Sequence, residues 1–149
     1  MSGITTVTSV IMNDPKLVIL DTSSLIQCFI GKDEYLKEIS KFVESNQVIL
    51  CLCFETMLEL QKTIAKPEVK KYLIYRQAII AKFVAWYKYN TLIFDIKSTH
   101  ILNRDPKDSM WLNLIESSKA QYLITNDKDL LDLKEFLNCK IINKKNFKI

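Results

Sequence analysis

Short apolar runs alternate with amphipathic segments along most of the chain, and this alternation is what most restricts its fold. We predict buried strands from the apolar runs at residues 17–20, 47–53, 91–96, 122–125 and 140–142. We predict helices where apolar residues recur at helical spacing, over residues 23–30, 33–45, 54–60, 68–89, 108–118 and 130–133. Alternating strands and helices predict an α/β fold, a three-layer sandwich whose parallel sheet is covered by helices on both faces.

Glycine and proline are scarce in this chain, with two and three residues among 149. The loops must therefore be short, and the chain is long enough for one domain with a sizeable core. Residues 1–15 are polar and rich in threonine and serine, whereas the alternating pattern starts just after them. We expect a short N-terminal extension over residues 1–15 and a single domain over residues 16–149.

Nothing in the sequence predicts export or membrane insertion. The N-terminus lacks the basic start and hydrophobic stretch of a signal peptide, and no segment approaches the roughly 20 apolar residues of a membrane span. The four cysteines match no zinc spacing, and His100 is the single histidine. Cys51 and Cys53 are expected to be small core hydrophobes on one side of a strand. Reduced cysteines suit a cytoplasmic protein.

An aspartate, Asp21, directly follows the first buried strand, which is where open α/β folds usually place their chemistry. Three further acids occupy comparable positions. Glu59 lies in the helix after the second strand, Asp108 begins the helix after the third, and Asp127 follows the fourth. Because the carboxyl ends of parallel strands meet at one edge of a sheet, we expect these four carboxylates to converge.

A cluster of carboxylates needs a positive charge to stay ionised. Two carboxylates about 5 Å apart repel by roughly 3 kcal/mol at an effective dielectric near 20. Oxygen ligands alone select hard cations, so the expected cofactor is Mg²⁺ or Mn²⁺. One or two such ions activate a water and neutralise the charge that develops on a phosphodiester.

Simpler interpretations exist for each residue taken alone. Asp108 suits any helix start, Asp127 any turn, and Glu55 and Glu59 any solvated helix surface. The formal net charge of +4 fits either a lysine-rich surface or a protein that tolerates polyanions. The candidate phosphate contacts are Lys62, Lys66, Lys107 and Lys128.

Several segments together resemble the successive motifs of PIN-domain ribonucleases, and in particular the VapC-like toxin components of toxin-antitoxin systems. The resemblance spans residues 16–149 and rests on the segments at residues 21–23, 59–60, 104–108 and 122–131. It implies a five-stranded parallel sheet in the order 3-2-1-4-5. By position, the family's acidic site corresponds to Asp21, Glu59, Asp108 and Asp127. The accessory positions are Asp105, Ser23, Thr125 and Asn126.

The resemblance implies a metal-dependent endoribonuclease that cleaves single-stranded RNA, with a separate antitoxin protein as partner and a homodimer as a further possibility. An alternative is a PIN-fold module that binds RNA or protein without turnover. A third class, a phosphate-signalling receiver or an aspartate-nucleophile phosphatase, fits poorly. The phosphatase requires a second aspartate two residues after the first, where this chain has Ser23.

Overall fold

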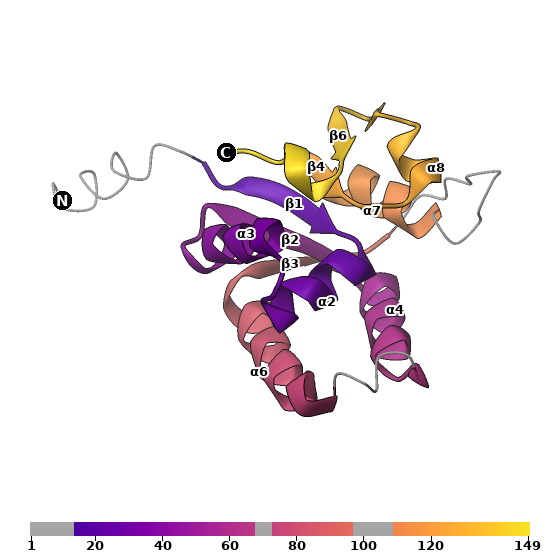
Figure 1. Cartoon of the computed structure of the whole chain (residues 1–149). Coiled ribbons are helices and arrows are strands. Elements are labelled where there is room, and N and C mark those ends of the chain that lie inside the picture. The colour runs from indigo at the N-terminus through magenta and orange to yellow at the C-terminus, as the bar shows by residue number, and fades with distance from the viewer. Residues whose placement is uncertain (1–13, 68–72, 97–108) are drawn as a thin grey trace, which may run out of the picture.

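A six-stranded sheet forms the centre of the computed structural model, which describes residues 14–67, 73–96 and 109–149 (Figure 1). The strands are β1 (Lys16–Leu20), β2 (Val48–Cys53), β3 (Thr91–Phe94), β4 (Tyr122–Ile124), β5 (Glu135–Phe136) and β6 (Cys139–Ile142). They lie in the order β3-β2-β1-β4-β6-β5, and all neighbours are parallel except β5 and β6. The expected α/β fold and strand order 3-2-1-4-5 are therefore confirmed for the five parallel strands.

One strand was not expected. The two residues of β5 pair antiparallel with β6 at the edge of the sheet. The turn between them is Leu137 and Asn138, both with positive φ angles of 47° and 66°. Two positive φ values in a row are the geometry of a tight hairpin turn, which usually contains glycine. Because leucine is unusual there, the sequence carries no clear signal for this hairpin.

The helices follow the expected alternation. Their bounds are α2 (Thr22–Ile30), α3 (Glu34–Glu44), α4 (Phe54–Ile64), α6 (Leu73–Tyr89), α7 (Ser109–Ser118), α8 (Lys128–Leu131) and the 3-10 helix η2 (Lys144–Asn146). The predicted starts of two helices, at residues 68 and 108, lie outside the described residues. Within the described part of the chain, no helix combines the length and apolarity needed to cross a membrane.

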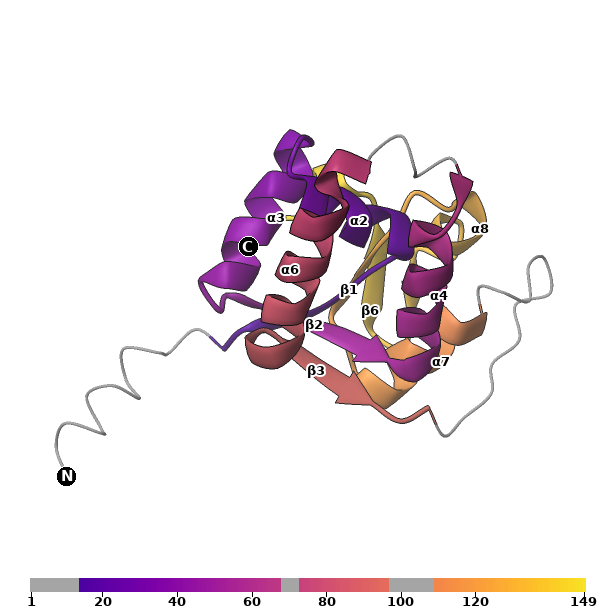
Figure 2. The same cartoon turned by 90° about the horizontal axis from the view of Figure 1, so that it is seen from below.

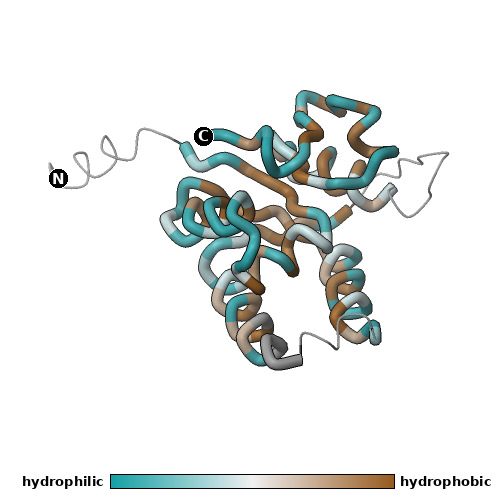
Figure 3. The backbone as a smooth tube through the Cα atoms, viewed as in Figure 1, coloured by the Kyte–Doolittle hydropathy of each residue, from teal (hydrophilic) through white to brown (hydrophobic). Residues whose placement is uncertain are grey.

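Alternate residues of β1 belong to two separate core clusters. Val18 and Leu20 pack with apolar residues of α2, α3 and α6, whereas Ile19 packs with residues of α7 and α8. These two groups of helices lie on opposite sides of the strands (Figure 1 and Figure 2), and the backbone is coloured hydrophobic along the central strands (Figure 3). A strand buried on both faces explains why residues 17–20 are apolar without alternation.

The apolar residues of α6 are buried only in part. Ile80, Phe83 and Val84 recur at helical spacing, but of these three only Phe83 packs against the core, whereas Ile80 is 47% exposed and Val84 57% exposed. The residue that is buried most deeply on this helix, among those whose burial is described, is Trp86, which packs edge-on against Phe29 of α2. Apolar residues surround most of α6, so periodicity could not select the buried side.

Cys51 and Cys53 are core residues, as expected, and so are Cys28 and Cys139. Cys28, Cys51, Cys53 and Cys139 are free and buried, and Cys51 and Cys53 belong to the same core cluster. Burial raises the pKa of the Cys28, Cys51 and Cys139 thiols to about 12, so they are neutral at physiological pH.

The C-terminal segment folds back onto α3. Lys144 of η2 forms an ion pair with Asp33, whose carboxylate also caps α3 by accepting a 3.0 Å hydrogen bond from the amide of Leu36. Phe147 packs edge-on against Phe42 of α3 and Tyr122 of β4. This segment therefore closes one end of the larger core cluster.

Candidate active site

The candidate site lies where β1 and β4 end side by side at the centre of the sheet. Their pairing continues one residue beyond the strands, because the amide of Asp21 donates a 3.1 Å hydrogen bond to the carbonyl of Ile124. Asp21 follows β1 and Thr125 follows β4. Neighbouring parallel strands whose connections leave in different directions form a topological switch point, the usual ligand site of such sheets.

Asp21 is held as the N-cap of α2. Its backbone is extended, with φ −65° and ψ 167°, and its Oδ1 accepts a 2.8 Å hydrogen bond from the amide of Ser24. The positive end of the helix dipole also favours a negative charge at this position. The hydrogen bond from Ser24 fixes the orientation of the half-buried Asp21 carboxylate.

Thr125 connects Asp21 to Asp127. Its hydroxyl, in a side chain only 1% exposed, donates a 2.7 Å hydrogen bond to Oδ2 of Asp21. The hydroxyl oxygen of Thr125 also accepts a 3.0 Å hydrogen bond from the amide of Asp127. The amide of Asn126 lies 3.4 Å from Oδ2 of Asp21. One buried hydroxyl therefore positions a carboxylate on one strand end and the backbone of the second aspartate on the other.

Asp127 caps α8 in the same way that Asp21 caps α2. Its Oδ1 accepts hydrogen bonds from the amides of Asp129 (2.8 Å) and Leu130 (3.2 Å). Within the described part of the chain, its Oδ2 makes no hydrogen bond. Each aspartate thus uses its backbone neighbours for orientation, and Asp127 keeps one oxygen for another ligand.

Glu59 lies on the side of α4 that faces α2. Thr63, one turn further along α4, lines a cavity together with Ser23 of α2, and residues four apart share one side of a helix. Glu59 is half-buried, and no hydrogen bond or ion pair joins it to Asp21 or Asp127 among the described residues. Glu59 therefore shares the side of α4 that carries Thr63 and faces α2.

Several predicted site residues lie outside the described residues. These are Asp105, Asp108 and Lys107. Across residues 14–67, 73–96 and 109–149, no three acidic, histidine or cysteine side chains lie close enough to hold a metal ion. The four-carboxylate metal site thus remains a prediction, while Asp21 and Asp127 are placed together.

The atoms around the aspartate pair fit an oxygen-ligated cation in part. Asp21 and Asp127 offer carboxylate oxygens, the ligands that Mg²⁺ and Mn²⁺ prefer. No lysine or arginine of the described chain forms an ion pair with either of them. Next to Asp21, the buried hydroxyl of Thr22 has no hydrogen-bond partner in the described structure, a situation that ordered water normally resolves.

The remaining predicted residues of the described chain lie on the surface. Ser23 is exposed at the first turn of α2, Asn126 is exposed after β4, and Lys62, Lys66 and Lys128 are exposed on or near α4 and α8. The sequence did not reveal the contribution of the Ser24 and Asn126 backbone amides. Backbone donors leave no side-chain signal in a sequence.

A family model described as the PIN domain matches residues 17–129, a span that contains Asp21, Glu59, Asp108 and Asp127. This chain belongs to the PIN domain family. PIN domains are generally nucleases, that is, hydrolases that cleave phosphodiester bonds.

The fold of this PIN domain is also found in a solved complex. A chain in the crystal structure of VapBC2 from Rickettsia felis, bound to a DNA fragment from their promoter, is similar to it with a TM-score of 0.56. The two chains share 12% sequence identity, over 85% of this chain and 98% of the other. At this identity the likeness supports the fold alone. A search of curated proteins gave no match.

Proposed function

We propose that this PIN domain is a Mg²⁺- or Mn²⁺-dependent endoribonuclease that cleaves single-stranded RNA. The observation that carries the proposal is the fixed pair of aspartates at the switch point, linked by the Thr125 hydroxyl. Membership of a family of nucleases supports it. Asp21 and Asp127 would hold the ion, with Glu59 and Asp108 completing the set of ligands.

The residues of the chain have distinct roles in this reaction. A bound divalent ion supplies an activated water and compensates the charge on the phosphate. Thr125 and the cap of α2 fix Asp21, so that little reorganisation is needed when the substrate binds. One of the four carboxylates accepts the proton of the attacking water, whose oxygen bonds to phosphorus as the bond to the leaving ribose oxygen breaks.

The test is cleavage of single-stranded RNA in the presence of manganese. We expect Asp21→Asn and Asp127→Asn each to lower the rate at least about 100-fold, because each removes charge that the ion needs. Glu44→Gln is a matched control, since Glu44 is an exposed acid at the end of α3. Wild-type rates in both aspartate variants would rule out the proposed site.

A second candidate function is binding of RNA without cleavage. The observation in its favour is that the acids of the described residues do not gather into a three-ligand metal site. Calorimetric titration with manganese distinguishes the two functions. The nuclease requires Mn²⁺ binding that Asp21→Asn and Asp127→Asn abolish, whereas a binding module shows RNA binding that is indifferent to the metal.

The apolar surface of α4 and α6 supports a protein partner. A groove with a volume of about 360 Å³ runs between the two helices, lined by Phe54, Leu58, Ile80 and Phe83 among others. Phe54 is 64% exposed, and Val84 extends the apolar surface along α6. Exposed apolar patches rimmed by polar residues usually mark protein interfaces.

The similar chain in VapBC2 supports an antitoxin as that partner, with this chain as the toxin component. The test is a search beside its gene for a small open reading frame, followed by coexpression of the encoded protein with this chain. We expect Leu58→Glu and Ile80→Glu to abolish copurification, and Tyr35→Glu, an exposed apolar position on α3, to leave it intact. A dimer of this chain alone, lost in the same two variants, would instead assign the groove to a second copy.

A further inference from the structure

A second cavity, with a volume of about 270 Å³, opens between α2 and α4 beside the candidate site. Ser23, which lines it, follows Asp21 by two residues in the chain, and Thr63 lines it from α4. Pockets for drug-sized ligands usually measure about 300 to 1,000 Å³. A cavity just below that range suits one small planar group attached to a larger ligand.

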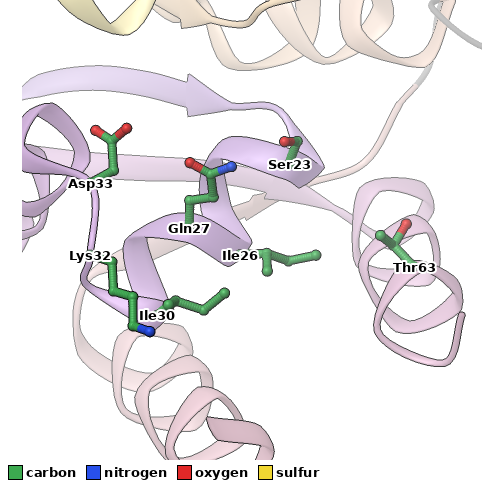
Figure 4. A pocket seen from close by; sticks show the side chains of 7 residues that line it. All are labelled: Ser23, Ile26, Gln27, Ile30, Lys32, Asp33 and Thr63. Carbon is green, nitrogen blue, oxygen red and sulfur yellow. The ribbon is translucent and has the colours of Figure 1, made fainter. Parts of the chain in front are cut away.

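The walls of this cavity combine an apolar floor with polar groups. Ile26 and Ile30, four residues apart on α2, provide the apolar surface, and Figure 4 shows Ile26 extending toward Thr63. Ser23 and Gln27, also four residues apart, are exposed on the same helix. The polar side chains therefore begin with Ser23, close to Asp21 in the chain, and continue with Gln27 one helical turn further along α2.

The Gln27 amide is the group best placed to read a ligand. Its side chain makes no hydrogen bond within the described part of the chain, so both its NH₂ donor and its carbonyl acceptor are available. A glutamine amide pairs in a bidentate manner with N6 and N7 of adenine. Isolated bases of single-stranded RNA present these edges to side chains.

The charges around the cavity also fit a polyanion. Asp33 lines the cavity, but its carboxylate is paired with Lys144. Lys32 lines it as well, so the acid of the lining is paired and a lysine stands beside it. A phosphate backbone can therefore approach without meeting an uncompensated acid on this side.

We propose that this cavity is a base-recognition subsite of the nuclease: it holds an adenine of the RNA beside the cleaved phosphate, and Gln27 reads the edge of that base. The proposal rests on RNA being the substrate, as argued above. Ser23 lies between the aspartate pair and Gln27 along α2, where the sugar and phosphate that connect the base to the reacting phosphodiester would pass. Gln27 is thus assigned to specificity and takes no part in the chemistry.

The experiment measures binding, so that it does not depend on cleavage. In an Asp127→Asn background, fluorescence anisotropy gives the affinity for single-stranded oligoadenylate, oligocytidylate and oligouridylate of equal length. We expect the adenine oligonucleotide to bind most tightly. Gln27→Leu should weaken the affinity for oligoadenylate about tenfold and change the affinities for oligocytidylate and oligouridylate by less than about twofold. Gln27→Glu should shift the preference toward cytosine, whose N4 donates to a carboxylate. Gln61→Leu, an exposed glutamine of α4 outside this cavity, is the matched control.

Each outcome decides the proposal. Equal binding of the three oligonucleotides, a preference for another base, or an equal loss for all three in Gln27→Leu would overturn it. A Gln27-dependent adenine preference supports it even where the parent chain with Asp127 intact fails to cleave RNA with manganese. That combination would reject the proposed nuclease activity and leave the base subsite standing, so the two failures are distinguishable.

Discussion

Thr125 and Asp21 lie 104 residues apart in sequence and are joined by a 2.7 Å hydrogen bond from the Thr125 hydroxyl to Oδ2 of Asp21. The same hydroxyl accepts a hydrogen bond from the amide of Asp127, so Thr125 determines the relative position of the two aspartates. Thr125 is buried, so water cannot easily replace it. It acts as a positioning residue for the site and does not itself need to touch RNA.

Replacing Thr125 with valine should separate positioning from stability. Thr125→Val keeps the shape but removes both hydrogen bonds, and we expect cleavage to fall between about 10- and 100-fold, since small misplacements of reacting groups have effects of that size. Thr125→Ser, which keeps the hydroxyl, should stay within about threefold of the wild-type rate. The measurement is the rate of RNA cleavage across manganese concentrations. An unchanged rate in the valine variant would remove Thr125 from the site.

The orphaned hydroxyl of Thr22 gives a second prediction. Since it has no partner in the described structure, Thr22→Val should change the free energy of unfolding by less than about 1 kcal/mol, or increase it. Thr56→Val is the control, because the Thr56 hydroxyl donates to the carbonyl of Cys53 (2.9 Å) and accepts from its amide (3.0 Å). That variant should lose about 1 to 3 kcal/mol. Urea unfolding measures both, and equal losses would show that Thr22 has a partner after all.

The buried thiols predict how stability depends on alkaline pH. Burial raises the pKa of Cys51 from the ordinary value of 9.0 to about 12, so the folded chain keeps a proton that the unfolded chain releases first. The stability linked to this raised pKa is fully present below pH 9 and is lost as the pH rises from 9 to 12. We expect Cys51→Ala to be less stable at pH 7 but to lose stability less steeply above pH 9, measured by urea unfolding. Parallel curves for the two proteins would contradict the assignment.

The ion pair between Asp33 and Lys144 predicts a different effect in acid. Burial of Asp33 by itself would raise its pKa, but the hydrogen bond from Lys144 and the amide of Leu36 outweigh this, so the pKa is lowered. The stability from this pair is present above the unfolded pKa near 3.8 and is lost as the pH falls through the lower folded value. Asp33→Asn keeps the helix cap and removes the charge. It should lower stability at pH 7 by up to about 1 kcal/mol, and the difference should vanish in strong acid.

The sequence was sufficient to locate Asp21 and Asp127 because each follows a short buried strand. Strands of that kind are recognisable from continuous apolar runs, and the parallel arrangement places their carboxyl ends together. The strand order came from the resemblance to PIN domains, since periodicity says nothing about which strands are neighbours. The contact between Asp21 and Thr125 depends on that order.

Two features were out of reach of the sequence pattern. The burial of α6 could not be read from its apolar residues, because they surround the helix and the groove beside α4 leaves Ile80 exposed. The strand β5 has two residues and a turn through Leu137, which lacks the usual glycine signal. In both cases the deciding factor is tertiary packing, which local composition does not encode.

The two ends of the site are made at very different times. Asp21 is synthesised 104 residues before Thr125, and Phe147, which packs on the core beneath β4, follows later still. Because a ribosome adds about 5 to 20 residues per second, a nascent chain passes several seconds with Asp21 alone. The aspartate pair therefore assembles only after residues 125–127 have left the ribosome, so a nascent chain that stops short of them holds Asp21 without its partner.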